Sequence, residues 1–238
     1  MTAGSAIAAN LAAARDAIIR AAGRAGRDPS TIRLVAVSKT FPASLVREAA
    51  GAGQTAFGEN RVQEGLEKIE QLADLPLEWH LIGHLQSNKA KRAVVAFPWI
   101  HSVDSRELFD RLDRAAHEAG TTPNVLIQVD MAGETTKHGV PPDELADLLS
   151  TAAAARAVRP RGLMLLPPFP DDPEDSRPWF RRLRELRDQL VASGVPAPML
   201  AELSMGMSHD FEIAIEEGAT IVRVGTAIFG RRPPPVEP

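Results

Sequence analysis

The fold follows from a repeating pattern that begins with Leu34-Val35-Ala36-Val37-Ser38-Lys39. Short β-branched runs like this one recur along the chain, and stretches with the apolar spacing of helices separate them. The runs predicted as strands are Leu34–Ser38, Thr55–Phe57, Trp79–Ile82, Ile100–Val103, Val125–Asp130, Gly162–Leu166, Met199–Leu203 and Thr220–Val224. The predicted helices are Leu45–Ala50, Val62–Leu72, Leu108–Ala119, Leu145–Ala155, Phe180–Leu190 and Phe211–Glu217. This alternation favours parallel strands joined by crossover helices.

Eight such units in 238 residues fit a single α/β domain over residues 1–238, closed as a TIM-type (β/α)8 barrel. The Ala-rich start of the chain lacks the apolar core of a signal peptide, so we expect it to form an extra N-terminal helix. Proline-rich Pro167–Pro173 is predicted as a long loop after the sixth strand, and Pro233–Pro238 as a disordered tail.

The composition excludes several classes of protein. The chain has no cysteine, which rules out disulfide scaffolds, thiolate metal sites and cysteine nucleophiles. Its net charge of -4 gives no electrostatic reason to expect nucleic acid or an anionic membrane as a partner. No apolar run approaches the roughly 18 residues of a membrane span. We therefore expect a soluble cytoplasmic protein.

Lys39 closes the first predicted strand and, by the period of two, points into the barrel with Val35 and Val37. Desolvation there would lower the pKa of the amine and make it a nucleophile able to form a Schiff base. The alternative is a strand-end lysine that extends to water. Lysine is scarce in this chain, at five residues, and the inward position favours the functional interpretation.

The segment Arg223–Gly230 leads the last strand into a short apolar helical turn. Its Gly225 permits close backbone approach, Thr226 offers a hydroxyl, and the free N–H groups of a helix start bind anions. Segment Leu203–Ser208, after the seventh strand, could add donors. Each segment alone could be a loop cap, but TIM barrels often hold phosphate at this position, so together they predict a phosphate site.

Two histidine patterns give weaker evidence of a functional site. His80 and His84 are four residues apart, but their strand-like surroundings deny them a common helical face, so we expect no metal site. The contiguous Ser208-His209-Asp210 cannot align as a hydrolytic triad, and is predicted instead as a helix start with Asp210 near its positive end.

Nearly the whole chain resembles the pyridoxal phosphate homeostasis proteins, the alanine racemase N-terminal-domain-like family. The segments that carry the resemblance are Val35–Lys39, Phe57–Glu64, Trp79–Lys89, His101–Ser105, Gly162–Met164, Leu203–Asp210 and Arg223–Gly230. The resemblance implies a fold-type-III barrel that binds pyridoxal 5′-phosphate (PLP) and has no catalytic residue. The residues that it implies at the cofactor are Lys39 as the Schiff base, Ser204, Gly225 and Thr226 at the phosphate, Arg223 at the pyridine nitrogen, and Asn60 beside the cofactor.

Two positions depart from the family pattern. Phe41 stands where many relatives carry a second lysine, which argues against a cofactor relay through that position. Asp130 replaces the usual asparagine and adds a negative charge. Lys137 matches the family's lysine in the loop after the fifth strand.

The period of two also turns Arg223 inward, together with Ile221 and Gly225. A guanidinium cannot give up its proton, so at a pyridine nitrogen it would leave that nitrogen unprotonated and make the ring a poor electron sink. The alternative is that Arg223 pairs with a carboxylate such as Glu202 or Asp130.

The resemblance implies a non-catalytic carrier or buffer of PLP that maintains vitamin B6 and amino and keto acid pools. It further implies a monomer, with PLP-dependent apoenzymes as candidate recipients. The alternative is a PLP-dependent amino-acid racemase, which needs an acid/base group on each face of the substrate. Related two-domain racemases supply a tyrosine, and this chain has none, although His84 or His209 could substitute. A binding module without cofactor is the third hypothesis.

Overall fold

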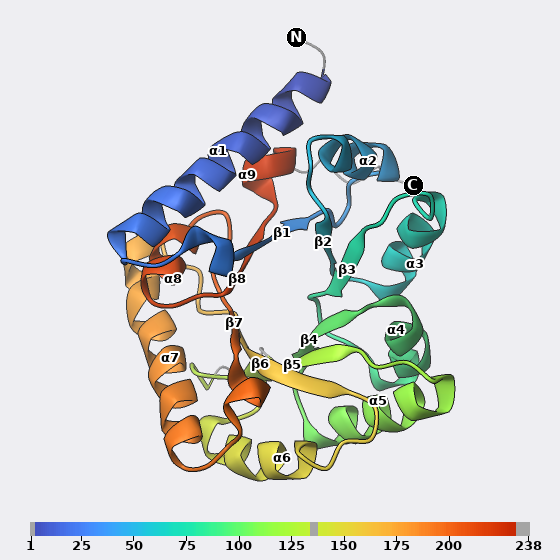
Figure 1. Cartoon of the computed structure of the whole chain (residues 1–238), viewed down its shortest axis with the longest axis vertical. Helices are drawn as coiled ribbons and strands as arrows, with labels where there is room; N and C mark the ends of the chain where they lie inside the picture. Colours follow the sequence, from blue (N-terminus) through green and yellow to red (C-terminus); the bar gives the residue numbers. More distant parts are fainter. Residues whose placement is uncertain (1–2, 134–137, 232–238) are drawn as a thin grey trace.

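The computed structural model describes residues 3–133 and 138–231 and contains a closed barrel of parallel strands surrounded by helices (Figure 1). The strands follow one another around the barrel in chain order, and β8 pairs with β1 to close it. Their bounds are β1 (Arg33–Val37), β2 (Ala56–Glu59), β3 (Glu78–Leu81), β4 (Trp99–Val103), β5 (Asn124–Val129), β6 (Arg159–Leu165), β7 (Glu202–Ser204) and β8 (Ile221–Val224). The predicted barrel is confirmed. Two predictions, the Pro233–Pro238 tail and the Lys137 match, lie outside the described residues.

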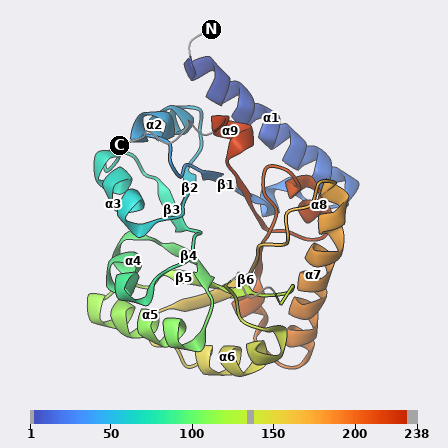
Figure 2. The same cartoon turned by 180° about the vertical axis from the view of Figure 1, so that it is seen from behind.

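The helices form the outer layer, and the predicted extra N-terminal helix is present as α1. It lies across the outside of α8 and α9, as the views from both sides show (Figures 1 and 2). Asn10 on α1 donates a 2.9 Å hydrogen bond to the carbonyl of Ile228 on α9. The helices are α1 (Ala3–Arg24), α2 (Ala43–Gly51), α3 (Val62–Gln71), α4 (Ala90–Ala96), α5 (Arg106–Ala119), α6 (Leu145–Ala152), α7 (Arg177–Ala192), α8 (Phe211–Glu216) and α9 (Thr226–Phe229).

The strands bury both faces, as parallel barrel strands must. One face packs against the helices and includes Ala36, Val222 and Val224. The other fills the barrel interior. The apolar residues of that interior cluster are Val35, Ala56, Trp99, Leu126, Met164 and Ile221. The alternation along β1 and β8 confirms which side of each strand faces inward.

Two elements differ from the prediction. The seventh strand was expected over Met199–Leu203, but a 3-10 turn occupies Ala197–Leu200 and β7 spans Glu202–Ser204. Pro196 and Pro198 explain the shift, because proline fixes φ and cannot donate to a sheet ladder. Helix α4 was not predicted, because its seven residues merge into an apolar run. The loop expected at Pro167–Pro173 is present and ends in the 3-10 turn Pro173–Ser176. Among the described helices, none is long and apolar enough to cross a membrane.

Candidate functional site

The residues selected from the sequence gather where the strands end. Lys39 and Asn60 follow β1 and β2, while Ser204 ends β7. Gly225 follows β8 directly, and β8 pairs with β1, so Gly225 lies beside the end of β1. A Cβ added to Gly225 would stand 3.2 Å from the carbonyl oxygen of Val37. The carboxyl ends of the strands are the face on which TIM barrels carry their functional residues.

The turn that carries Lys39 has a strained backbone. Thr40 has φ +68°, the one positive value among the described residues other than glycine. Its N–H donates to the Glu64 carboxylate at 2.5 Å, and the N–H of Phe41 donates to the carbonyl of Ser38 at 3.1 Å. A non-glycine residue keeps this conformation only when its surroundings determine it. The half-buried Lys39 is therefore held in a fixed turn.

A buried cluster of Ser38, Glu59, Glu64 and Lys68, which we call the Glu59 cluster, lies beneath this turn. Lys68 Nζ donates to Glu59 at 2.7 Å, to Glu64 at 2.8 Å and to the carbonyl of Ser38 at 2.7 Å. The Ser38 hydroxyl donates to Glu59 at 2.6 Å. Burial raises the pKa of Glu59, and the Lys68 ammonium and the Ser38 hydroxyl oppose that rise. Helix α3 thus fixes both neighbours of Lys39.

Phe41, the departure from the family pattern, has a packing role. Its ring is buried and stacks on Phe229 of α9, with centroids 5.2 Å apart. The contact joins the turn after β1 to the short helix after β8. An aromatic pair of this kind stabilises the structure through its buried area and its ring geometry.

Arg223 is buried in the barrel interior, as predicted. Its guanidinium donates to the Ser204 hydroxyl at 2.5 Å and to the carbonyl of Leu165 at 2.9 Å. The alternative pairing with Glu202 or Asp130 is wrong, because Arg223 forms no ion pair or hydrogen bond with either carboxylate in the described residues. Glu202 accepts the Thr220 hydroxyl at 2.6 Å. Asp130 accepts two backbone N–H groups of the turn that follows β5.

Behind Arg223 a chain of hydrogen bonds, which we call the interior relay, crosses the barrel. Ser204 Oγ lies 2.9 Å from His101 Nδ1, and His101 Nε2 lies 2.9 Å from His80 Nδ1. His80 Nε2 lies 3.0 Å from the carboxylate of Glu78. Both imidazoles and the serine are fully buried, whereas Glu78 is partly exposed at the opposite end of β3.

The chemistry of the two ends gives the interior relay one direction. A guanidinium only donates and a carboxylate only accepts. The Ser204 hydroxyl therefore accepts from Arg223 and donates to His101 Nδ1. His101 in turn donates from Nε2 to His80, and His80 donates from Nε2 to Glu78. Each histidine is thereby assigned as the neutral Nε2–H tautomer.

The pKa values agree with neutral links between charged ends. Burial, reinforced by the nearby His80 and Arg223, holds the pKa of His101 well below its usual value. Burial also lowers the pKa of His80, against the effect of Glu78. Burial lowers the pKa of Arg223 to about 10, which still leaves the guanidinium charged at neutral pH. The hydrogen bond from His80 keeps the pKa of Glu78 below its usual value.

The start of α9 is organised by Ser208, which the sequence analysis placed in the donor segment Leu203–Ser208 but did not assign to the cofactor. Its Oγ accepts the N–H of Gly225 at 3.1 Å and the N–H of Ala227 at 3.3 Å. Thr226 is exposed beside them. Ser204, which was expected at this position, lies instead in the interior relay. The position of each serine relative to the strand could have distinguished their roles. Ser204 ends a strand, whereas Ser208 belongs to the loop beyond it.

Asp210 fixes that loop. Its carboxylate accepts the N–H of Met207 at 2.7 Å and the hydroxyl of Ser176 at 2.9 Å. Helix α8 begins at the next residue, Phe211, which confirms the predicted helix start.

A Cβ on Gly83 would stand 2.3 Å from the carbonyl oxygen of Asn60, so the loops after β2 and β3 meet backbone to backbone.

His80 and His84 have separate partners. His80 belongs to the interior relay, whereas His84 lies at the rim with its Nδ1 3.0 Å from the carboxylate of Asp104. His209, the other histidine considered as an acid/base group, stacks on Phe169 with centroids 5.1 Å apart.

The model of the alanine racemase N-terminal domain family matches residues 5–233 of the chain. The pyridoxal phosphate homeostasis protein of Aquifex aeolicus is 49% identical over 215 residues, which cover 90% of this chain and 93% of the relative. The chain belongs to this family. A second relative of the same name, from Pseudomonas aeruginosa, is 47% identical over 229 residues and 96% of each chain.

The fold of the family is also known from solved structures. PipY of Synechococcus elongatus, solved with PLP bound, superposes on this chain with a TM-score of 0.84 and 44% identity. The match covers 94% of this chain and 100% of PipY. Membership in the family confirms the resemblance stated from the sequence segments.

Proposed function

We propose that this chain binds PLP without turning over a substrate, and that it carries or buffers PLP to maintain vitamin B6 and amino and keto acid homeostasis. The observation that supports this most is the meeting of β1 and β8, which brings the Lys39 turn beside the N–H groups at the start of α9. The relatives named as pyridoxal phosphate homeostasis proteins and the PLP-bound PipY support the choice of ligand.

The donor set fits the chemical groups of PLP. Its aldehyde calls for an amine, which Lys39 would supply, and its phosphate calls for N–H and O–H donors. Gly225 and Ala227 offer two N–H groups at one point, now satisfied by Ser208. The hydroxyls of Ser208 and Thr226 would add to them. We keep Ser204 in the set as a residue that orients Arg223, and Asn60 as a neighbour of the cofactor.

When bound, PLP supplies an electrophilic aldehyde conjugated to a ring that can take up electrons. Arg223 would face the pyridine nitrogen of that ring. Because a guanidinium offers only N–H donors and the pKa of Arg223, about 10, keeps it charged, Arg223 can neither give nor take a proton at neutral pH. An unprotonated pyridine withdraws electrons poorly, which suits a protein that holds PLP without consuming it.

The racemase alternative needs an acid/base group on each face of the substrate. The sequence contains no tyrosine to supply one. His80 and His101 are committed to the interior relay, and His84 and His209 are engaged with Asp104 and Phe169. These contacts favour the non-enzymatic carrier.

Borohydride reduction of the PLP-loaded protein, followed by peptide mapping, tests the attachment. We expect the pyridoxyl group on Lys39 and a visible absorption band that Lys39→Ala removes. The matched control is Lys89→Ala, which changes a lysine at the end of the 3-10 turn Ser87–Lys89 and should keep the band. A pyridoxyl group found mainly on Lys89 or Lys137, with Lys39→Ala still yellow, would overturn the assignment.

Chiral chromatography of alanine and serine incubated with the loaded protein tests the absence of turnover. We expect no sustained interconversion of enantiomers. Racemisation at ordinary enzymatic rates, about 1 to 10³ per second, would establish the alternative instead.

Within this proposal the chain works in the cytoplasm as a monomer and passes PLP to PLP-dependent apoenzymes, with no nucleic acid or membrane as a partner. Light scattering on the loaded protein and reactivation of an apoenzyme by it measure the two points. A dimer, or an apoenzyme that recovers no faster than with free PLP, would contradict them.

A further inference from the structure

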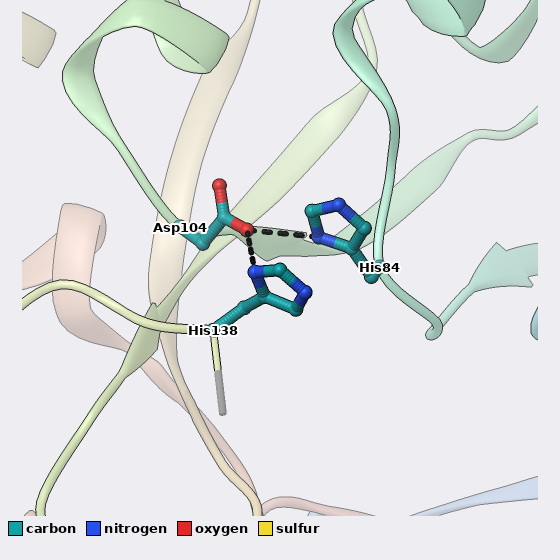
Figure 3. Close-up of side chains that lie close together, drawn as sticks. All are labelled: His84, Asp104 and His138. Atoms are coloured by element: carbon teal, nitrogen blue, oxygen red, sulfur yellow. Dashed lines mark hydrogen bonds and ion pairs between the residues drawn. The ribbon is translucent and has the colours of Figure 1, made fainter. Parts of the chain in front are cut away.

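We propose that His84, Asp104 and His138 form a binding site for a divalent transition metal ion of the zinc class at the rim of the barrel. The three side chains converge from different loops, and their potential ligand atoms all lie within 4.8 Å of one another (Figure 3). His84 Nδ1 is 3.0 Å and His138 Nδ1 is 3.7 Å from the same oxygen, Asp104 Oδ2. Among residues 3–133 and 138–231, this is the one place where three such side chains meet.

The ligand types decide the class of ion. Two imidazole nitrogens and one carboxylate oxygen suit zinc and neighbouring transition metals, whereas magnesium and calcium prefer oxygen ligands throughout. Ligand atoms about 2.0–2.2 Å from a common zinc ion lie roughly 3–3.6 Å from one another. The two measured nitrogen to oxygen distances are close to that range before any adjustment.

Hydrogen bonds to the neighbouring residues hold the loops that carry His84 and Asp104. The carbonyl of Gly83, before His84, accepts the Ser102 hydroxyl at 2.7 Å. Asp104 follows β4 directly, and Ser105 caps α5 by accepting the N–H of Leu108 at 3.2 Å. Ligands on such well-determined backbone need little ordering when an ion binds.

His138 is held to β5 although it lies far along the loop. Its carbonyl accepts the side-chain amide of Gln128 at 2.5 Å. The N–H of Val140, two residues on, donates to the carbonyl of Gln128 at 2.8 Å. Gly139 has φ +155°, and a Cβ there would stand 2.6 Å from the backbone nitrogen of Asp130. The close packing of Gly139 keeps His138 facing Asp104.

The rings must move slightly to bind an ion. The imidazoles of His84 and His138 stack with centroids 3.6 Å apart and planes 10° from parallel. An imidazole binds a metal ion in its own plane, so the rings must tilt out of this stack to meet at one ion. Both side chains are exposed enough to turn, at 42% and 56%, whereas the carboxylate of Asp104 is 11% exposed and stays in place.

Three protein ligands leave at least one coordination position of the ion for water or another small ligand. The site shares no residue with the interior relay, the Glu59 cluster or the proposed PLP contacts. It therefore does not depend on the proposed function.

Calorimetric titration of the tag-free, full-length chain with zinc chloride tests the site. We use the Lys39→Ala protein as well as the unmodified chain, so that PLP and its own affinity for metals play no part. We expect one zinc ion per chain, and affinity at least about tenfold weaker in His84→Ala, His138→Ala and Asp104→Asn. The matched control, His117→Ala, removes an exposed histidine on α5 and should bind zinc as the unmodified chain does.

Absorption spectra of the cobalt-substituted protein give a second readout, because the d–d bands report nitrogen ligands that His84→Ala and His138→Gln each remove. Circular dichroism and the urea midpoint show that the variants are folded. Absence of saturable zinc binding by the unmodified chain would overturn the proposal, and so would affinities in the three ligand variants that equal that of His117→Ala. Magnesium chloride in place of zinc should give no heat of binding.

Discussion

Lys39 and Arg223 are held by two buried polar groups of different construction. In the Glu59 cluster, a lysine contacts two carboxylates directly at 2.7 and 2.8 Å. In the interior relay, three neutral side chains separate the charged Arg223 from the charged Glu78. Direct contact compensates each charge locally, so the loss of one member leaves a buried charge alone. Loss of a neutral member of the interior relay leaves only unsatisfied polar atoms, but the relay requires both histidines to stay unprotonated.

The largest effect should come from Lys68→Met. It leaves Glu59 buried without its cation, and we expect a loss of about 3–5 kcal/mol in the free energy of unfolding measured by urea titration. Adding Glu59→Gln should recover part of that loss. Lys91→Met, which removes an exposed lysine in an ion pair with Glu118, is the control. A cost for Lys68→Met no larger than for this control would show that the charges of the Glu59 cluster are not buried in solution.

A smaller loss should follow from His101→Phe. The phenyl ring fills the space, but Ser204 and His80 each lose one of their two side-chain hydrogen-bond partners and keep only Arg223 and Glu78, respectively. We expect a loss of about 1–3 kcal/mol in the same titration. The variant should also retain PLP less tightly, because Ser204 no longer has a fixed orientation toward Arg223. His117→Phe serves as the surface control. Equal stability and equal PLP retention in the two variants would contradict the interior relay.

The pH dependence of the free energy of unfolding distinguishes the interior relay from the Glu59 cluster. The folded-state pKa values of His80 and His101 lie below the value of about 6.5 in the unfolded chain. The unfolded state therefore binds more protons in acid, and the stabilisation present above pH 6.5 is lost as the pH falls. We expect this loss to be measurable as a lower free energy of unfolding at pH values below 6.5.

Glu59 contributes with the opposite sign. Burial raises its folded-state pKa, so its protonation favours the folded state as the pH falls. Because His101→Phe removes one of the two histidines with a lowered pKa, the free energy of unfolding of this variant should fall less steeply below pH 6.5. His117→Phe should leave this acid part of the stability curve, the acid limb, unchanged. An acid limb that survives His101→Phe in full would assign the loss to other groups.

The smallest effect is expected at the surface. Arg47 donates to both oxygens of Asp74 at 2.6 and 2.7 Å, but both side chains are about half exposed. Arg47→Gln should leave the urea midpoint unchanged within error, since solvent screens such pairs. A measurable shift would mean that geometry matters here as much as burial.

Periodicity predicted most of the fold, because the strands of a parallel barrel are buried runs of β-branched residues. It placed β7 too early, because apolar Met199 and Leu200 resemble strand residues. The nearby prolines are the only sequence signal that this segment is a turn and not a strand. It also identified the inward direction of Arg223. Strand ends were enough to select Lys39, Gly225 and Thr226 as candidates, because a barrel gathers those ends on one face.

The interior relay could not be predicted in this way. Ser204 and His101 are 103 residues apart and lie on strands that do not pair, so their contact depends on the diameter and register of the whole barrel. The same holds for His84 and His138, which meet only because β3, β4 and β5 are neighbours. The sequence showed the types of these residues but not which of them face one another.

Helix α1 has a consequence for the synthesis of the protein. Its apolar face, which includes Leu11 and Ile18, is synthesised long before the α8 and α9 surfaces that it contacts. At about 5–20 residues per second, the ribosome needs on the order of ten to forty seconds to supply them. During that interval the nascent chain carries an amphipathic helix without its final partners. Burial of α1 against α8 and α9 therefore waits until both helices have left the exit tunnel, and it coincides with closure of the barrel.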